Sequence, residues 1–127
     1  MGNPVTKFQI LSKNPEAHAS FYASLFGWTI DAANALGYRE AKTGSSRGIE
    51  GGFWPAPAEA PAFVQLFVEV EDVEAHVARA TQLGASVIIP PQKLPDGDEL
   101  AILLDPQGIS VGLVAKREPG QERAAGT

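Results

Sequence analysis

The chain has 127 residues, 44% hydrophobic and 20% charged, which predicts one globular domain with a core of its own. Fifteen acidic residues against ten basic ones give a formal net charge of −5, and the basic residues are scattered, which argues against a nucleic-acid surface. The absence of cysteine excludes disulfide bonds, thiolate metal sites and a cysteine nucleophile.

The first predicted element is a strand over residues 5–11, "VTKFQIL". Its side chains alternate, with Phe8 and Ile10 on one face and Lys7 and Gln9 on the other. The apolar face suits packing against a helix, and the polar face suits solvent or a ligand.

A helix follows in "SKNPEAHASFYASLFG". Asn14 is the candidate N-cap, Pro15 takes the first helical position, and Gly27 ends the helix. Three short strands are then expected, separated by turns that contain Asn and Gly, at 27–31, 36–42 and 48–54.

The pattern starts again after the Pro/Ala-rich stretch 55–62. "FVQLFVEV" predicts a strand with two different faces. The helix-packing face carries Val64, Leu66, Val68 and Val70, and the opposite face carries Phe63, Gln65, Phe67 and Glu69. A second helix begins at the Asp72 cap and ends at Gly84. Further strands are expected at 85–89, 98–105 and 109–115.

The two halves resemble each other, since Glu-Ala-His recurs at an offset of 58 residues, from Glu16 to Glu74. We interpret the chain as two βαβββ modules. They form a single domain over 1–117, with module 1 at about 4–54, a linker at 55–62 and module 2 at about 63–116. The polar segment 118–127 is expected to be a flexible tail.

The last predicted strand contains a glycine in its interior, Gly112, directly after the turn "DPQG". Glycine in a strand costs roughly 0.5–1 kcal/mol against alanine. Its presence often marks a bulge or a close approach to the backbone.

The paired βαβββ pattern, "FYASLFGW" at the end of the first helix and "DPQGISVGL" near the end of the chain together resemble the vicinal oxygen chelate superfamily. This superfamily includes glyoxalase I, extradiol dioxygenases and bleomycin-resistance proteins. The resemblance implies an α+β fold in which the modules form one curled, half-open barrel-like mixed sheet, with the helices on its convex face.

Metal-using members of the superfamily place four ligands, commonly His and Glu, on the concave face of the sheet. The resemblance puts the first position at Lys7, the third at Gln65 and the fourth at Gly112. The second falls at Gly51, or at Glu50 if the alignment slips by one residue. Lysine is protonated at neutral pH and glycine has no donor side chain, so we expect no metal and no other cofactor.

The leading hypothesis is a metal-free protein that binds a small molecule in the concave groove. Lys7 would meet an anionic group and Gln65 would donate an orienting hydrogen bond, while aromatic side chains supply stacking area. The predicted groove residues are Lys7, Gln9, Gly51, Phe53, Phe63, Gln65, Phe67 and Gly112.

Two other functions stay open. A glyoxalase- or dioxygenase-like enzyme would need an atypical metal or acid–base work by Glu50 or by a deprotonated Lys7. A non-catalytic interaction module would use the groove face as its dimer interface. Alternatively, Lys7 and Gln65 would simply be polar residues on a sheet face exposed to solvent. His18 and His76 belong to the helix layer and are not expected to be ligands.

The partner expected is a small molecule, with neither nucleic acid nor membrane. No apolar run reaches the roughly 18–20 residues of a membrane helix, and "MGNPVTK" does not resemble a signal peptide, so we expect a cytoplasmic protein. By analogy with small members of the superfamily, we also expect a homodimer.

Overall fold

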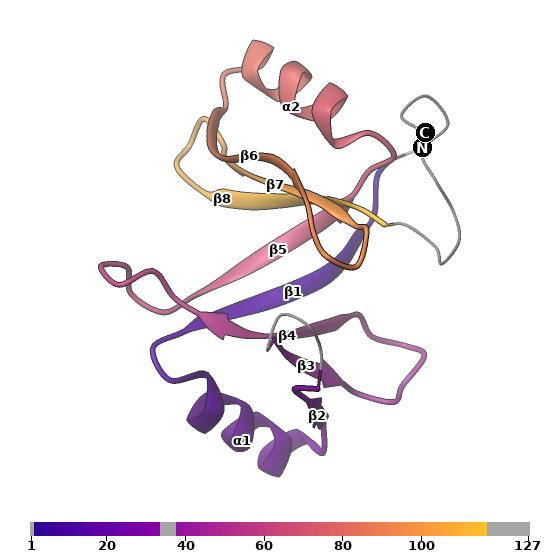
Figure 1. Ribbon diagram of the computed structural model, residues 1–127, viewed down its shortest axis with the longest axis vertical. Coiled ribbons are helices and arrows are strands. Elements are labelled where there is room, and N and C mark those ends of the chain that lie inside the picture. Colours follow the sequence, from indigo (N-terminus) through magenta and orange to yellow (C-terminus); the bar gives the residue numbers. More distant parts are fainter. Residues whose placement is uncertain (1, 34–37, 117–127) are drawn as a thin grey trace. The chain divides into compact units, whose positions relative to one another are not determined.

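The structure is a computed structural model that describes residues 2–33 and 38–116 (Figure 1). The predicted tail 118–127 and the first two residues of the predicted strand 36–42 lie outside the described residues. The chain divides into two compact units. The first unit is Val5–Phe67, and the second contains the described residues before Val5 and from Val68 onward.

The first unit contains most of one βαβββ module and the start of the next strand. Its elements are β1 (Val5–Ser12), α1 (Pro15–Phe26), β2 (Thr29–Asp31), β3 (Arg39–Lys42) and β4 (Glu50–Pro55), followed by β5 (Phe63–Glu69), which continues into the second unit. The strands of the module are ordered β2-β3-β4-β1. β1 and β4 are parallel and the other pairs are antiparallel, so the sheet is mixed.

Both ends of α1 follow the local chemistry of the sequence. The Asn14 side chain accepts a hydrogen bond from the backbone N–H of Ala17, at 3.1 Å. Gly27 adopts the left-handed conformation, with φ of 76°, and its N–H donates to the Ala23 carbonyl oxygen at 2.9 Å. The predicted helix boundaries are confirmed.

α1 packs against β4 and its neighbours (Figure 1). The core between helix and sheet is built from Ile10, Ala19, Ala41 and Phe53. The Tyr22 ring of α1 lies 5.8 Å from the Phe53 ring, centroid to centroid. This packing assigns one face of the β1–β4 sheet to the helix and leaves the polar residues of β1 on the other.

The second unit holds α2 (Val73–Gln82) and three antiparallel strands, β6 (Ser86–Lys93), β7 (Glu99–Leu104) and β8 (Ser110–Ala115). The Asp72 side chain caps α2 by accepting from the Ala75 N–H at 3.1 Å, as predicted. β6 is longer than the predicted 85–89, because two register irregularities let the strand continue through its two prolines.

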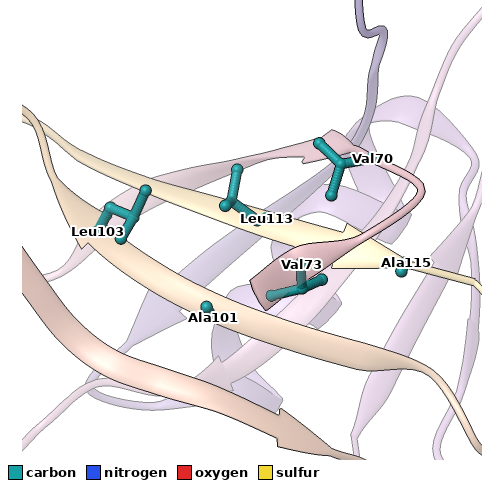
Figure 2. Packing of buried hydrophobic residues seen from close by; sticks show 6 residues of the cluster. All are labelled: Val70, Val73, Ala101, Leu103, Leu113 and Ala115. Atoms are coloured by element: carbon teal, nitrogen blue, oxygen red, sulfur yellow. The ribbon is translucent and has the colours of Figure 1, made fainter. Parts of the chain in front are cut away.

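The core of the second unit lies between α2 and the strands (Figure 2). Val73 at the start of α2 is fully buried, and Ala101 of β7 beneath it is equally inaccessible. The complete cluster is Val70, Val73, Ala101, Leu103, Leu113 and Ala115. These side chains alternate along β7 and β8, as expected for strands with one face covered by a helix.

The predicted α+β class, with two βαβββ modules and a mixed sheet, is confirmed. Neither of the two helices formed by the described residues is long and apolar enough to cross a membrane.

Candidate functional site

Three strands of the first unit place polar side chains on the sheet face opposite α1. Lys7 pairs with Glu50 and Gln9 with Gly52 between β1 and β4, and Glu40 of β3 pairs with Gly52. Paired residues of adjacent strands project to the same side of a sheet. These five residues are called the Lys7 face below.

The Lys7 ammonium group lies over two aromatic rings. Its Nζ atom is 5.4 Å from the centroid of the Tyr38 ring and 5.5 Å from that of the Phe67 ring. Both distances are within the range of cation–π attraction, which is worth roughly 0.5–1 kcal/mol at exposed sites and more when the pair is desolvated. The positive charge is therefore held at the sheet rather than extended into solvent.

Tyr38 precedes β3 and lies across the sheet over Gly52. A Cβ atom on residue 52 would overlap the Tyr38 hydroxyl group, so glycine provides the space for the phenol. The Gln9 side chain lies beside the Tyr38 hydroxyl group, and the Tyr38 ring is 5.9 Å from the Trp54 ring. Burial raises the pKa of Tyr38 well above its usual value, and the charges of Glu40 and Glu50 raise it further, against the opposing effect of the neighbouring Gln9 amide.

β5 contributes two buried residues on alternate positions. Gln65 is 3% exposed and Phe67 is 2% exposed, while Phe63 at the start of the strand is half-buried. The amide Nε2 of Gln65 donates a long hydrogen bond of 3.5 Å to the Leu66 carbonyl oxygen. Gln65 and Phe67 share one face of the strand. The Gln65 amide therefore lies on the same side of β5 as the Phe67 ring, which contacts the Lys7 ammonium.

The opposite face of β5 differs from the expectation. Val64 is 60% exposed and Leu66 is 47% exposed, although both were predicted to pack against a helix. The reason is that α1 packs on β4, β3, β2 and β1. The prediction is confirmed for Val68 and Val70 of this face, which pack in the core of the second unit, and it is wrong for Val64 and Leu66.

Gly51 and Phe53 require a correction, because they lie on the α1 face and not with Lys7. Gly51 pairs with Phe8, and a Cβ atom at position 51 would overlap the Phe8 ring. Phe53 pairs with Ile10, is 1% exposed and contacts Tyr22 of α1. Of the two alternatives that the sequence left open for β4, Glu50 is the residue on the Lys7 face.

Gly112 belongs to the second unit. It is buried in β8, pairs with Ile102 of β7, and lies opposite in phase to Leu113, which packs in the α2 core. Its predicted phase in the strand is therefore correct. Its role as a groove residue stays a prediction.

The donors of the Lys7 face do not fit a divalent cation. Such an ion takes four or more nitrogen or oxygen ligands, whereas this face offers the Lys7 ammonium, the Gln9 amide, the carboxylate of exposed Glu50 and that of Glu40, which is 3.8 Å from the Lys42 ammonium. Across 2–33 and 38–116, no three His, Asp or Glu side chains gather closely enough to hold a metal ion.

Both histidines are in the helical layer, as predicted. The Nδ1 atom of His18 is 2.7 Å from the buried Ser12 hydroxyl oxygen, which also accepts the Asn14 N–H at 3.0 Å. His76 bonds through Nδ1 to the Asp72 carbonyl oxygen at 3.1 Å. These contacts tie the histidines to the starts of α1 and α2.

An open, mainly apolar pocket of about 340 Å³ lies beside the Ser12–His18 pair, on the α1 side. It is lined by Ser12, Lys13, Asn14, Ala17, His18, Phe21 and Ala62. The Lys13 ammonium already donates to the Pro57 and Ala58 carbonyl oxygens, so the charged group of this wall is bound to the linker.

Sequence reasoning missed Tyr38. It lies in the predicted strand 36–42, two residues before Glu40, so the two side chains are expected on the same face of the strand. Its position on the polar face was therefore predictable from the pattern. The adjacent strand with two consecutive glycines was a second signal, because a residue without a side chain leaves room for a neighbouring ring.

Comparison with known proteins gives a consistent family assignment. The family model of the glyoxalase-like domain matches residues 8–114. CFP32, a glyoxylase by name, from Mycobacterium bovis and Mycobacterium tuberculosis, is 29% identical over 116 residues, or 89% of this chain. The chain spans 44% of the length of these relatives.

Solved structures share the fold at low identity. A hypothetical protein from Bacillus halodurans has a TM-score of 0.70 and 13% identity, covering 96% of this chain and 100% of that one. A methylmalonyl-CoA epimerase variant from Streptomyces coelicolor, in complex with 2-nitronate-propionyl-CoA, has a TM-score of 0.63 and 19% identity, with coverage of 91% and 99%. The Mycobacterium tuberculosis epimerase has a TM-score of 0.60 and 16% identity, with coverage of 90% and 88%.

Proposed function

Since the chain belongs to the glyoxalase-like domain family of the vicinal oxygen chelate superfamily, we propose that it binds a small anionic molecule on the Lys7 face, without a metal ion. The observation that carries the proposal is the Lys7 ammonium, held over the Tyr38 and Phe67 rings on a sheet face that α1 does not cover. A fixed cation beside aromatic surface suits a ligand that joins an acid group to an apolar or aromatic part.

Each part of the ligand has a candidate partner. The acid group would bind the Lys7 ammonium, and the apolar part would contact Phe67. Gln9 and Gln65 carry amide groups that can donate to ligand oxygens. Phe63, which was also predicted for the groove, is proposed as a neighbour of the ligand and awaits the same test.

The relatives widen the set of molecules to be tested. Methylmalonyl-CoA epimerase structures of this fold contain acyl-CoA molecules, namely 2-nitronate-propionyl-CoA and methylmalonyl-CoA. At identities of 16–20% these structures support the fold alone, so CoA thioesters enter as one class in a ligand panel. Small aromatic and aliphatic carboxylates form the other class.

The test is an NMR titration of protein labelled with ¹³C at the lysine ε carbon. The chain has five lysines, so the signals can be assigned by single substitutions. Benzoate serves as the first probe and its neutral analogue benzamide as the control for charge. We expect benzoate to shift the Lys7 signal, benzamide to have little effect, and Lys7→Met to abolish binding, whereas Lys93→Met, at an exposed lysine of β6, leaves it intact.

Two results would refute this function. The first is that no carboxylate or CoA thioester of the panel perturbs the Lys7 signal at millimolar concentration, where the binding free energy is about −4 kcal/mol. The second is that Lys7→Met and Lys93→Met bind the same ligands equally well.

Acid–base catalysis on the same face is the second candidate function. The β1–β4 register pairs Lys7 directly with Glu50, so an ammonium and a carboxylate face the same ligand. Glu50 would accept a proton and Lys7 would stabilise the negative charge that develops. Activity on any panel member that persists in the Lys7→Met/Glu50→Gln double variant would exclude this mechanism.

The homodimer and the cytoplasmic location remain predictions. Exposed Val64 and Leu66 form apolar surface of the kind that a second subunit covers. Light scattering would give twice the 13.4 kDa of one chain for a dimer. A monomeric mass would rule out the alternative in which the protein is only a dimeric interaction module.

A further inference from the structure

We propose that Tyr38 is a positioning residue that holds the Lys7 ammonium in place for the ligand, and that Gly52 is the residue that admits it. This inference rests on the proposed binding function, because it assigns the residue that orients the cation of that site. It adds a specificity determinant that lies outside the predicted groove set.

Tyr38 is confined by three neighbours. Gly52 leaves the space in which its hydroxyl group lies. The Gln9 side chain lies beside that hydroxyl, and the Trp54 ring packs 5.9 Å from the Tyr38 ring. A side chain confined at its tip and along its ring has little rotational freedom left.

Lys7 is held in place before a ligand binds. Its four-carbon side chain has many rotamers in solution, and fixing such a chain has an entropic cost on binding. The Lys7 Nζ atom lies within 5.5 Å of the centroids of two rings, Tyr38 before β3 and Phe67 in β5. Because these contacts already restrict the side chain in the ligand-free protein, less entropy is lost when a ligand binds. The charged residues that share the face are Glu40, Lys42 and Glu50.

The Tyr38 side chain stays neutral. The phenol of Tyr38 stays protonated through the neutral range, as any tyrosine does, and burial raises its pKa further. The ammonium therefore meets the neutral ring face rather than a phenolate, whose full charge would compete with an anionic ligand.

The experiment is the ¹³C-lysine NMR spectrum of the ligand-free protein. Protons above a ring face are shifted upfield by the ring current, so the Lys7 ε-methylene signal should lie upfield of the other four lysines. We expect Tyr38→Phe to keep this shift, because it keeps the ring, and Tyr38→Leu to lose about half of it. Gly52→Ala should reduce it as well, whereas Gly48→Ala, where an added Cβ meets nothing within 4 Å, should not.

Benzoate binding provides the functional measurement. Loss of one cation–π contact of roughly 0.5–1 kcal/mol corresponds to about two- to fivefold weaker binding by Tyr38→Leu. Tyr38→Phe should restore most of the affinity, which a merely structural contribution of the hydroxyl would not allow.

The outcomes are distinguishable. A folded Tyr38→Leu protein with an unchanged Lys7 signal would overturn the positioning role. If that variant does not fold, NOE contacts between the Lys7 ε protons and the Tyr38 ring protons in the wild type decide, and their absence would overturn it. Ring-current shifts as expected, but without binding of any panel anion, would support the placement of Lys7 while refuting the proposed function.

Discussion

The Tyr38 hydroxyl lies where a Cβ atom of residue 52 would be, so the two residues depend on each other. On the opposite face of β4, the Phe8 ring fills the corresponding space over Gly51. Two consecutive glycines thus let aromatic side chains reach the backbone of β4 from both sides. The Tyr38 contact belongs to the candidate site, and the Phe8 contact belongs to the core under α1.

Gly52→Ala should destabilise the protein by about 1–3 kcal/mol, the usual cost of adding a methyl group to a packed position. The added Cβ would overlap the Tyr38 hydroxyl and would lie 2.6 Å from the Arg39 carbonyl oxygen, which is backbone and cannot easily move. Urea unfolding measures the change. Gly48→Ala is the matched control, and equal stabilities of the two variants would contradict the prediction.

Gly51→Ala should cost less than Gly52→Ala, roughly 1 kcal/mol, because the overlapping atoms all belong to the Phe8 side chain, whereas those at Gly52 include a backbone oxygen. The smaller side chain of Phe8→Leu should relieve part of this cost. A double-mutant cycle should therefore show coupling of about 0.5 kcal/mol or more between the two positions. Additive effects would mean that the ring does not occupy the space over Gly51.

Ser12→Ala should destabilise the fold by about 1–3 kcal/mol, although it removes only one oxygen atom. That oxygen is buried, accepts the Asn14 N–H and bonds to His18 Nδ1, so its loss removes one partner from each of two part-buried polar groups at the start of α1. Thermal unfolding compared with Ser24→Ala, an exposed position of α1, is the measurement. A loss no larger than that of Ser24→Ala would refute the role of the hydroxyl.

Alkaline pH should destabilise the wild type more than Tyr38→Phe. Burial raises the pKa of Tyr38 above the unfolded value of 10.0, so above that pH the unfolded chain loses the phenol proton while the folded protein keeps it. The stabilising contribution is complete below pH 10 and falls as the pH rises, by roughly 1.4 kcal/mol at pH 11. Urea unfolding from pH 8 to 11 tests this. Parallel pH profiles for the two proteins would contradict it.

Short-range chemistry made the helices and most strands predictable from the sequence. Asn14, Pro15 and Gly27 bound α1, and Asp72 starts α2, because caps and left-handed turns depend on residues only a few positions apart. The exposed Val64 and Leu66 were not predictable in the same way. Alternation shows that two faces of β5 differ, but only the position of α1 on β4 and its neighbours shows which face stays uncovered.

By itself, the sequence determined the order of the elements, the repeat of the two modules and the presence of Lys7 and Gln65 on a polar face, since these follow from local patterns of period 2 and 3.6. The tertiary structure decided the partners. The parallel register of β1 and β4 put Glu50 beside Lys7 and moved Gly51 to the α1 face. Tyr38 came over Gly52 in the same way, because contact between separate strands depends on register, and a shift of one residue exchanges the two faces.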